Sequence, residues 1–252
     1  MSELKVLVIG IASSLASLLA SPYRIENGIP LGVERTICGK NDMVNMIDQN
    51  EPLNLMGHPI GRYRSNDASG TSYCTGTLID KDLFLTANHC AGKCSGITVE
   101  FGYLASTRVE VFPCQEIVES GGNDYNDDYF IIRLKGNPGV RWGWHTPSDK
   151  PLDSEAPLLM IHHPMATPMK VSMNNCAFVE EQDGLLSHRC DTESGSSGSA
   201  LLAPDFDHPE NTRIVGVHTL GGCNSSETSF NSGPSMRFLV KLSETLRVHA
   251  KP

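Results

Sequence analysis

A Ser/Gly-rich segment at residues 190–202, CDTESGSSGSALL, has the residue types that could present a nucleophile to a substrate. Glycines allow sharp backbone bends, so one serine hydroxyl and the N–H groups beside it can point at the same small volume. The same composition also suits an ordinary turn between two strands. A serine hydroxyl is a poor nucleophile without a base beside it. The nucleophile interpretation therefore requires a base elsewhere in the chain.

His89 and Asp128 could supply that base and a carboxylate to orient it. His89 follows the apolar segment LFLTA and is flanked by a small-residue turn and a cysteine. Asp128 begins DYFIIRL, whose remaining residues read as a buried strand, whereas Asp124 and Asp127 resemble a solvated turn. A buried carboxylate needs a hydrogen-bonding partner, and an imidazole N–H would provide one. The order along the chain would be His89, Asp128 and then a serine of the 190–202 segment.

Short β-strands must position these residues. Apolar or alternating segments recur between turn signals, at 76–87, 96–104, 108–113, 128–134, 157–164, 170–180, 199–204 and 213–220. Many short strands at close spacing predict an all-β protein rather than parallel βαβ units. The Pro- and Gly-rich stretch at 135–157 reads as a linker between two β halves. Only the tail at 235–250 has helical spacing, with one apolar face formed by Leu239, Leu242, Leu246 and Val248.

Length, charge and cysteine content narrow the class of protein. A chain of 252 residues with 39% hydrophobic content can bury a full core. The net charge of −9, without a cluster of basic residues, argues against a nucleic-acid partner. The eight cysteines favour disulfides and an oxidising compartment. A zinc site at His89, Cys90 and Cys94 would need further closely spaced pairs, so we expect no metal or other cofactor.

The N-terminus has the pattern of a secretory signal peptide. Lys5 precedes an apolar run at 6–20, and Ser21-Pro22 follows it. The run is too short to span a bilayer comfortably but suits the hydrophobic region of a signal peptide. A buried N-terminal helix is less favoured, because the run is apolar all round and has no helix cap. We expect a signal peptide over residues 1–21, a secreted product and no membrane contact in the mature form.

The motifs TANHC, DYFIIRL and GSSGSA, in this order, resemble those of the chymotrypsin-like serine peptidases. The likeness covers most of residues 36–245. It implies two six-stranded antiparallel β-barrels, at about 36–138 and about 150–245, with the active site between them. Together with the helical tail, the expected fold is all-β with a C-terminal helix.

The resemblance also implies a role for each residue that matches a motif. Ser197 would attack the scissile carbonyl, His89 would take and return its proton, and Asp128 would hold the imidazole in the correct tautomer. The N–H groups of Gly195 and Ser197 would form the oxyanion hole. The protein would then be a serine endopeptidase acting on proteins or peptides, and we expect a monomer. A binding protein that has lost catalysis on the same fold is the alternative from another functional class.

Within that superfamily, the chain resembles the bacterial glutamyl endopeptidases more than it resembles the trypsins. DT at 191–192, GVHT at 216–219 and FNSG at 230–233 match or resemble motifs of that group. TICGKND at 36–42 resembles the start of its mature chains. The block CDTESGSSGSA is also similar to the secreted lysyl endopeptidases.

Two substrate preferences follow from these likenesses. The glutamyl resemblance implies cleavage after Glu, less often Asp, with the side chain of this P1 residue bound by His218, Thr192 and the freed α-amino group of Thr36. The alternative is a P1 Lys or Arg held by Asp191 or Glu193. A glutamate on the wall of an acid-binding pocket would repel the substrate unless it points away.

Two further positions bear on how the site is built. Ser196 stands where trypsins have an aspartate that pairs with the new N-terminus, so we expect the trypsin activation switch to be absent. His162-His163-Pro164 could be read as a metal-binding pair, but the resemblance implies a turn there, and the turn is favoured.

Maturation is expected to remove the segment between the signal and the domain. Residues 22–35, PYRIENGIPLGVER, read as a short propeptide that ends at Arg35. Cleavage after Arg35 would make Thr36 the mature N-terminus and leave residues 36–252 as the peptidase domain.

The eight cysteines are expected to form four pairs. We predict Cys74–Cys90 across the His89 loop and Cys176–Cys190 ahead of the nucleophile. Resemblance to the lysyl enzymes implies Cys38–Cys223, which would tie the mature N-terminus near the pocket. Cys94–Cys114 is then left by elimination.

Overall fold

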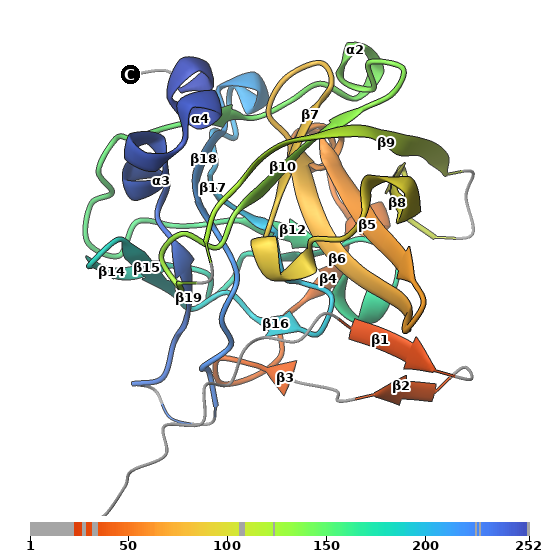
Figure 1. The fold of residues 1–252 in the computed structure, drawn as a ribbon. Helices are drawn as coiled ribbons and strands as arrows, with labels where there is room; N and C mark the ends of the chain where they lie inside the picture. The colour runs from red at the N-terminus through yellow and green to blue at the C-terminus, as the bar shows by residue number, and fades with distance from the viewer. Residues whose placement is uncertain are drawn as a thin grey trace, which may run out of the picture.

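Six antiparallel strands of the N-terminal half close into a barrel (Figure 1). The structure, a computed structural model, describes residues 23–26, 29–31, 35–105, 109–122, 124–224, 226 and 228–250. The spatial order is β6-β5-β8-β9-β10-β7, and pairing between β6 and β7 closes the ring. The strands are β5 Ile60–Asp67, β6 Gly70–Leu78, β7 Leu83–Thr86, β8 Ile97–Phe101, β9 Glu110–Ser120 and β10 Phe130–Leu134. The first predicted barrel is confirmed.

The interior of this barrel is filled by large side chains that alternate inward along the strands. Tyr63, Phe84, Phe101 and Phe130 are all buried in one apolar cluster. The rings of Phe84 and Phe101 meet edge to face, with centroids 6.0 Å apart. Such edge contacts pair the positive ring edge with the negative face and add to the free energy of burial. This packing fixes the end of β7, which precedes His89, relative to the start of β10, which follows Asp128.

The C-terminal half forms three short three-stranded sheets: β11-β18-β17, β12-β13-β4 and β14-β15-β19. Single bridges between Pro157 and Ala177, between Leu159 and Leu202, and between Gly216 and Ser235 connect these sheets into a second ring. Prolines at 157, 164 and 168 lack the N–H that a continuous ladder requires, which shortens the strands in this half. The strands are β12 Met160–His162, β13 Lys170–Ser172, β14 Phe178–Gln182, β15 Leu185–His188, β17 Ala200–Ala203, β18 Arg213–Val217 and β19 Asn231–Pro234.

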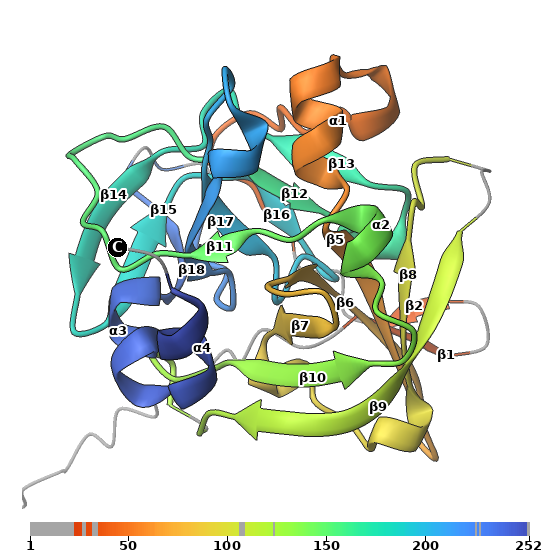
Figure 2. The same ribbon diagram turned by 90° about the horizontal axis from the view of Figure 1, so that it is seen from above.

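The predicted linker contains no long element. It carries α2 Gly139–Trp142 and β11 Thr146–Pro147, and Figure 2 shows it running between the two halves. The remaining elements are α1 Glu51–Gly57, β4 Val44–Asn45, β16 Thr192–Glu193 and short 3-10 helices at Met46–Asp48, Asn88–Cys90, Cys94–Gly96, Pro164–Ala166 and Pro209–Asn211.

The N-terminal segment contributes three short strands. β1 Tyr23–Glu26 pairs with β2 Ile29–Leu31 and with the edge of β6, and β3 Arg35–Thr36 pairs with β16. The predicted signal peptide, residues 1–21, lies outside the described residues. No helix in the described part of the chain is long and apolar enough to cross a membrane.

The C-terminal tail is helical but is divided into two helices. α3 Met236–Leu242 and α4 Glu244–His249 lie against β18 and β11 (Figure 2). Ser243 ends α3 in an extended conformation, and its Oγ accepts a hydrogen bond from Leu246 N–H at 3.0 Å to cap α4. The prediction of one apolar face was partly wrong. Leu239 and Leu246 are buried, whereas the turn at Ser243 leaves Leu242 50% and Val248 72% exposed.

Candidate active site

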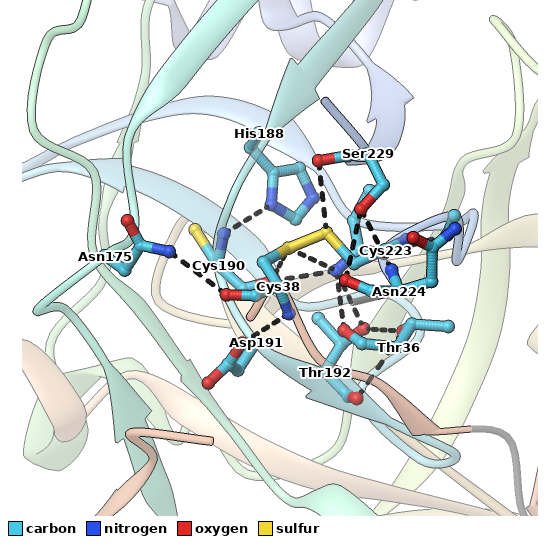
Figure 3. The surroundings of a disulfide bond; sticks show 12 residues. Thr36, Cys38, Asn175, His188, Cys190, Asp191, Thr192, Cys223, Asn224 and Ser229 are labelled. Atoms are coloured by element: carbon cyan, nitrogen blue, oxygen red, sulfur yellow. Dashed lines mark hydrogen bonds between the residues drawn. A yellow bond between two sulfur atoms is a disulfide. The ribbon is translucent and has the colours of Figure 1, made fainter. Parts of the chain in front are cut away.

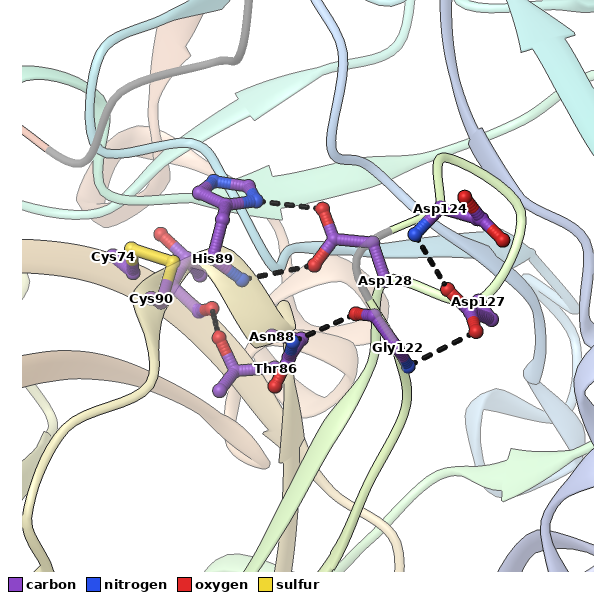
Figure 4. A network of polar contacts seen from close by, with 10 residues as sticks. Cys74, Thr86, Asn88, His89, Cys90, Gly122, Asp124, Asp127 and Asp128 are labelled. Carbon is purple, nitrogen blue, oxygen red and sulfur yellow. Dashed lines mark hydrogen bonds and ion pairs between the residues drawn. A yellow bond between two sulfur atoms is a disulfide. The ribbon is translucent and has the colours of Figure 1, made fainter.

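His89 and Asp128 lie together at the ends of two barrel strands, as the sequence predicted (Figure 4). His89 Nδ1 is 2.7 Å from one carboxylate oxygen of Asp128, and the His89 backbone N–H donates to the other at 3.0 Å. A carboxylate accepts only, so Nδ1 carries the proton and Nε2 is left as the basic nitrogen. His89 Nε2 is buried and has no hydrogen-bond partner among the described residues. This geometry suits a general base.

The turn that carries Asp128 is held by its own polar contacts. Asp127 accepts hydrogen bonds from the N–H groups of Gly122 and Asp124, each at 3.0 Å, and Asn88 Nδ2 donates to Gly122 O at 2.8 Å (Figure 4). The last contact ties the Asp128 turn to the residue that precedes His89. Asp127 therefore organises this turn. The sequence alone indicated only a solvated turn at this position.

Four disulfides are present, and they join the four pairs expected from the sequence: Cys38–Cys223, Cys74–Cys90, Cys94–Cys114 and Cys176–Cys190. Cys74–Cys90 connects β6 to the short helix that contains His89. Cys94–Cys114 connects the short 3-10 helix that precedes β8 to β9.

We expect the double replacement of Cys74 and Cys90 by serine to lower both stability and turnover. The bridge closes a separation of 16 residues, so its loss should cost about 2–4 kcal/mol of unfolding free energy. It should also lower kcat, because the turn bearing His89 loses its covalent tie to β6. The same change at Cys94 and Cys114, a separation of 20 residues, is the matched control and should lower stability with kcat retained. Urea unfolding and kcat measured well below the midpoint distinguish the two effects, and equal loss of kcat in both variants would contradict the assignment.

The 193–199 loop adopts the sharp bends that its glycines allow. Gly195 and Gly198 have φ values of 92° and 83°, in the left-handed region. A Cβ at Gly198 would lie 2.0 Å from Thr86 Oγ1 and 2.4 Å from Thr75 O. The loop therefore packs directly against the strand ends that lead to His89, and only glycine fits at the point of contact.

Hydrogen bonds from Thr75, in the first barrel, hold the loop from one side. Thr75 N–H donates to Ser197 O, and Thr75 Oγ1 donates to Gly195 O, each at 2.9 Å. The N–H groups of the same two residues, Gly195 and Ser197, donate no hydrogen bond within the described residues. Two free N–H groups beside a serine are what an oxyanion hole requires. Ser197 Oγ makes no hydrogen bond to His89 Nε2 in this structure, and such contacts are often long before substrate binds.

Ser196 is held by uncharged hydrogen-bonding partners, so this position does not need the new N-terminus that the aspartate of trypsins pairs with. Its Oγ is 2.8 Å from His162 Nδ1 and accepts the Glu193 N–H at 3.1 Å. Ser172 Oγ donates to Asp191 O, so His162 Nε2 must be the nitrogen that donates to Ser172, and Nδ1 accepts from Ser196. Burial lowers the pKa of His162 well below its usual value, which keeps the ring neutral.

The rings of the paired histidines, His162 and His163, are buried and hydrogen-bonded to neighbouring residues. His163 Nδ1 is 3.0 Å from Thr167 O, and its ring stacks on Tyr103 with centroids 5.9 Å apart. Pro164 begins the expected turn after them. Within the described residues, no group of three or more His, Cys, Asp or Glu side chains is arranged to bind a metal ion.

Thr36 and Thr192, two of the three predicted P1-binding residues, lie side by side. They are paired between β3 and β16, and their hydroxyls are hydrogen-bonded (Figure 3). The methyl group of Thr36 packs against Gly221, where an added Cβ would lie 2.4 Å from it. Asn231 Nδ2 donates to Thr36 O at 3.0 Å and is 3.3 Å from Thr192 Oγ1.

His218, the third of these residues, adjoins the 193–199 loop through its backbone. Its N–H donates to Ser199 O, and its C=O accepts from Gly198 N–H, each at 2.8 Å. The imidazole is 3% exposed, and burial lowers its pKa to about 3. Nearby His89 favours the neutral ring further, whereas Asp128 opposes this effect. His218 is therefore a neutral hydrogen-bonding group close to the candidate triad.

Asp191 faces the N-terminal segment. Its carboxylate accepts hydrogen bonds from Cys38 N–H at 2.8 Å and Asp42 N–H at 2.9 Å, and the residue is 2% exposed (Figure 3). Burial raises the pKa of Asp191 to about 6, opposed by these two hydrogen bonds. Both oxygens are occupied by backbone donors.

A family profile described as "Lysyl endopeptidase, C-terminal domain" matches residues 45–234. The chain belongs to this family. It is a serine-type endopeptidase with a chymotrypsin-like fold, and its substrates are proteins or peptides. No curated protein matches the chain.

Two solved structures resemble this endopeptidase in fold. A Glu endopeptidase in complex with MPD superposes with a TM-score of 0.64 at 21% identity, covering 84% of this chain and 96% of that one. A thermostable serine protease from an extremophilic microorganism superposes with a TM-score of 0.57 at 13% identity, covering 74% and 98%.

Sequence reasoning missed three residues that organise the endopeptidase's site: Thr75, His188 and Asn231. Thr75 follows a predicted disulfide cysteine, but nothing in its local pattern marks a hydroxyl that bonds a loop 120 residues away. Asn231 lies in the FNSG turn that was noted only as a family motif, and its side chain also donates to Cys190 O at 2.9 Å. His188 is the buried last residue of β15 and would be read from the sequence as an ordinary strand residue.

Proposed function

We propose that this endopeptidase is secreted as a monomeric zymogen and cleaves proteins or peptides after glutamate, less often aspartate, through an acyl-enzyme on Ser197. The His89–Asp128 hydrogen bond, with a buried His89 Nε2 that has no partner among the described residues, supports the assignment of the base. The neutral His218 beside the nucleophile loop, together with the occupied carboxylate of Asp191, supports the glutamate preference.

The chemistry follows from the positions of these groups. Ser197 Oγ attacks the carbonyl carbon while His89 Nε2 takes its proton, and the imidazolium formed is stabilised by Asp128. The oxyanion accepts hydrogen bonds from the N–H groups of Gly195 and Ser197. His89 then gives its proton to the leaving amine, and water hydrolyses the acyl-enzyme by the same steps in reverse order.

A glutamate side chain needs donors in a partly dry pocket, because its desolvation is otherwise uncompensated. His218 offers an imidazole N–H, and Thr192 offers a hydroxyl. Cleavage after Arg35 would add the α-amino group of Thr36, whose side chain contacts both Thr192 and Gly221. Together these three groups would give the proposed P1 site two neutral donors and one positive charge.

A lysine or arginine side chain would instead need a free carboxylate. Both oxygens of Asp191 accept from backbone N–H groups of the 38–42 segment, which favours a structural role for this residue. Glu193 is part-buried, and its backbone N–H and C=O are both bonded to Ser196. The family profile carries the word lysyl, so the P1 preference is the part of this proposal that most needs a direct test.

Replacing His218 with alanine should lower kcat/KM for substrates with P1 Glu. The loss corresponds to about 2–3 kcal/mol of transition-state stabilisation, the value of a hydrogen bond to a charged group. Labelling of Ser197 by a fluorophosphonate should persist. His145→Ala removes another buried histidine, whose ring is hydrogen-bonded to Met56 O, and should leave the P1 preference unchanged. A peptide library measures the preference of all three proteins.

The lysyl alternative is tested by Asp191→Asn in the same library. We expect this variant to lose stability but keep its preference for Glu, because one backbone N–H is left unpaired while the pocket is untouched. If the wild-type protein cleaves after Lys, and Asp191→Asn abolishes that cleavage, the glutamate preference is wrong and the serine mechanism stands.

Maturation should occur in two cuts, after the signal peptide at residues 1–21 and after the propeptide at residues 22–35. N-terminal sequencing of the secreted protein should then read TICGKND. Arg35→Gln should block the second cut and weaken cleavage after Glu, because no α-amino group forms at Thr36. Fluorophosphonate labelling should survive, since Ser196 is held by His162 rather than by a new N-terminus. Full Glu cleavage by protein that begins at residue 22 would contradict this role of Thr36.

A further inference from the structure

A chain of hydrogen bonds runs from the backbone at Cys190 through His188 to His218. Cys190 N–H donates to His188 Nδ1 at 3.2 Å, and His188 Nε2 is 3.2 Å from His218 Nδ1. The two rings are nearly perpendicular, at 81°, with centroids 5.2 Å apart. His188 is fully buried, and Figure 3 shows it beside Cys190, on the opposite side from Asp191. Neither ring contact was anticipated from the sequence.

The direction of this chain determines where each proton is. A backbone N–H can only donate, so His188 Nδ1 must be the unprotonated nitrogen, and a neutral His188 carries its proton on Nε2. His188 then donates to His218 Nδ1, which leaves the His218 proton on Nε2. Within the described residues, His218 Nε2 makes no hydrogen bond.

Both rings are neutral for the same physical reason. Burial lowers the pKa of His218 to about 3 and that of His188 well below its usual value. The ionisable groups that act on His218 are His89 and Asp128, and those that act on His188 are His218 and His162. A proton added to either ring would face another imidazole and little water.

We infer that His188 is a positioning residue for specificity: it holds His218 as the neutral Nε2–H tautomer, so that one fixed N–H donor faces the P1 side chain. This inference rests on the proposed glutamate preference. A fixed donor pairs with a carboxylate or amide oxygen, whereas the lysine ammonium has donors only and would leave the N–H unpaired. Without His188 the ring could hold its proton on either nitrogen, and the tautomer with Nδ1–H would present a lone pair to the P1 carboxylate.

Two substitutions separate positioning from packing. His188→Leu fills a similar volume but removes both hydrogen bonds, so His218 is free to change tautomer. His188→Gln keeps a carbonyl oxygen for Cys190 N–H and an N–H₂ group for His218 Nδ1. We expect kcat/KM for P1 Glu to fall about tenfold or more in His188→Leu and to stay close to wild type in His188→Gln. The rate of fluorophosphonate labelling should be unchanged in both.

The decisive readout is the tautomer itself. Nitrogen-15 NMR of the histidine side chains, in full-length protein carrying Ser197→Ala to prevent autolysis, should find the His218 proton on Nε2. In His188→Leu it should shift at least partly to Nδ1, which a loss of packing alone would not cause. A His218 protonated on Nδ1 in the parent protein, or a tautomer unchanged in His188→Leu, would overturn the inference. If His188→Leu fails to fold, the parent spectrum and His188→Gln still decide.

Failure of this inference can be told apart from failure of the proposed function. A wild-type protein that cleaves after Lys refutes the glutamate preference whatever the NMR result. A wild-type protein that cleaves after Glu, with His218 protonated on Nδ1, refutes only the role of His188.

Discussion

Ser197→Ala should lower kcat by about 10⁴- to 10⁶-fold, the range typical of removing a nucleophile that works together with a base. The hydroxyl is the only group removed, and Thr75 holds the loop that carries it by hydrogen bonds to the carbonyls of Gly195 and Ser197, so folding should be unaffected. Residual turnover above that of water is expected, because the N–H groups of Gly195 and Ser197 remain. The measurement is kcat on a P1 Glu peptide, together with the thermal unfolding midpoint.

Combining Ser197→Ala with His89→Ala should cost little more than either change alone, because nucleophile and base act as one unit. Ser69→Ala, in the exposed turn between β5 and β6, is the control for loss of a serine hydroxyl and should have wild-type kcat. Retained fluorophosphonate labelling in Ser197→Ala would assign the nucleophile to another residue.

Asp128→Asn should lower kcat by about 10⁴-fold with little change in structure. The aspartate accepts from both His89 Nδ1 and the His89 backbone N–H. An asparagine has one oxygen for these two donors, and its N–H₂ group facing Nδ1 would favour the wrong tautomer of His89. The basic nitrogen would then no longer face the nucleophile.

Asp124→Asn is the matched control for this change. Asp124 lies in the same turn, but the residue is exposed, and its hydrogen bonds to Asp127 come from its backbone N–H and C=O rather than from its carboxylate. We expect wild-type kcat from this variant. An equal loss of activity in Asp124→Asn and Asp128→Asn would mean that net charge in the turn, rather than the orientation of His89, decides the rate.

The barrel strands and the positions of the polar candidates could be predicted because their signals are local. Apolar runs between turn signals defined strands such as those ending at Thr86 and beginning at Phe130. His89 was notable because an apolar strand precedes it, and Asp128 because an apolar strand follows it. The helical tail was predicted on the same basis. Its division at Ser243 was not, because a serine can cap one helix and end another only when the surrounding packing favours the turn.

The second half of the fold was predicted less completely. Its strands are short and meet through single bridges such as Leu159 with Leu202. Proline positions in the sequence indicate where a ladder is interrupted, but they do not say which strands pair across the gap.

The sequence by itself determined the residue types available for chemistry: a serine between glycines, a histidine after one apolar strand, an acid before another, and cysteines enough for four bridges. Tertiary structure alone decided which way Asp191 faces, that His188 touches His218, and that Thr36 meets Thr192 across a separation of 156 residues. Flanking residues restrict a backbone's local conformation, so local patterns carry local information. The partner of a buried donor or acceptor is whichever group the folded chain brings within 3 Å, and that depends on every strand pairing between them.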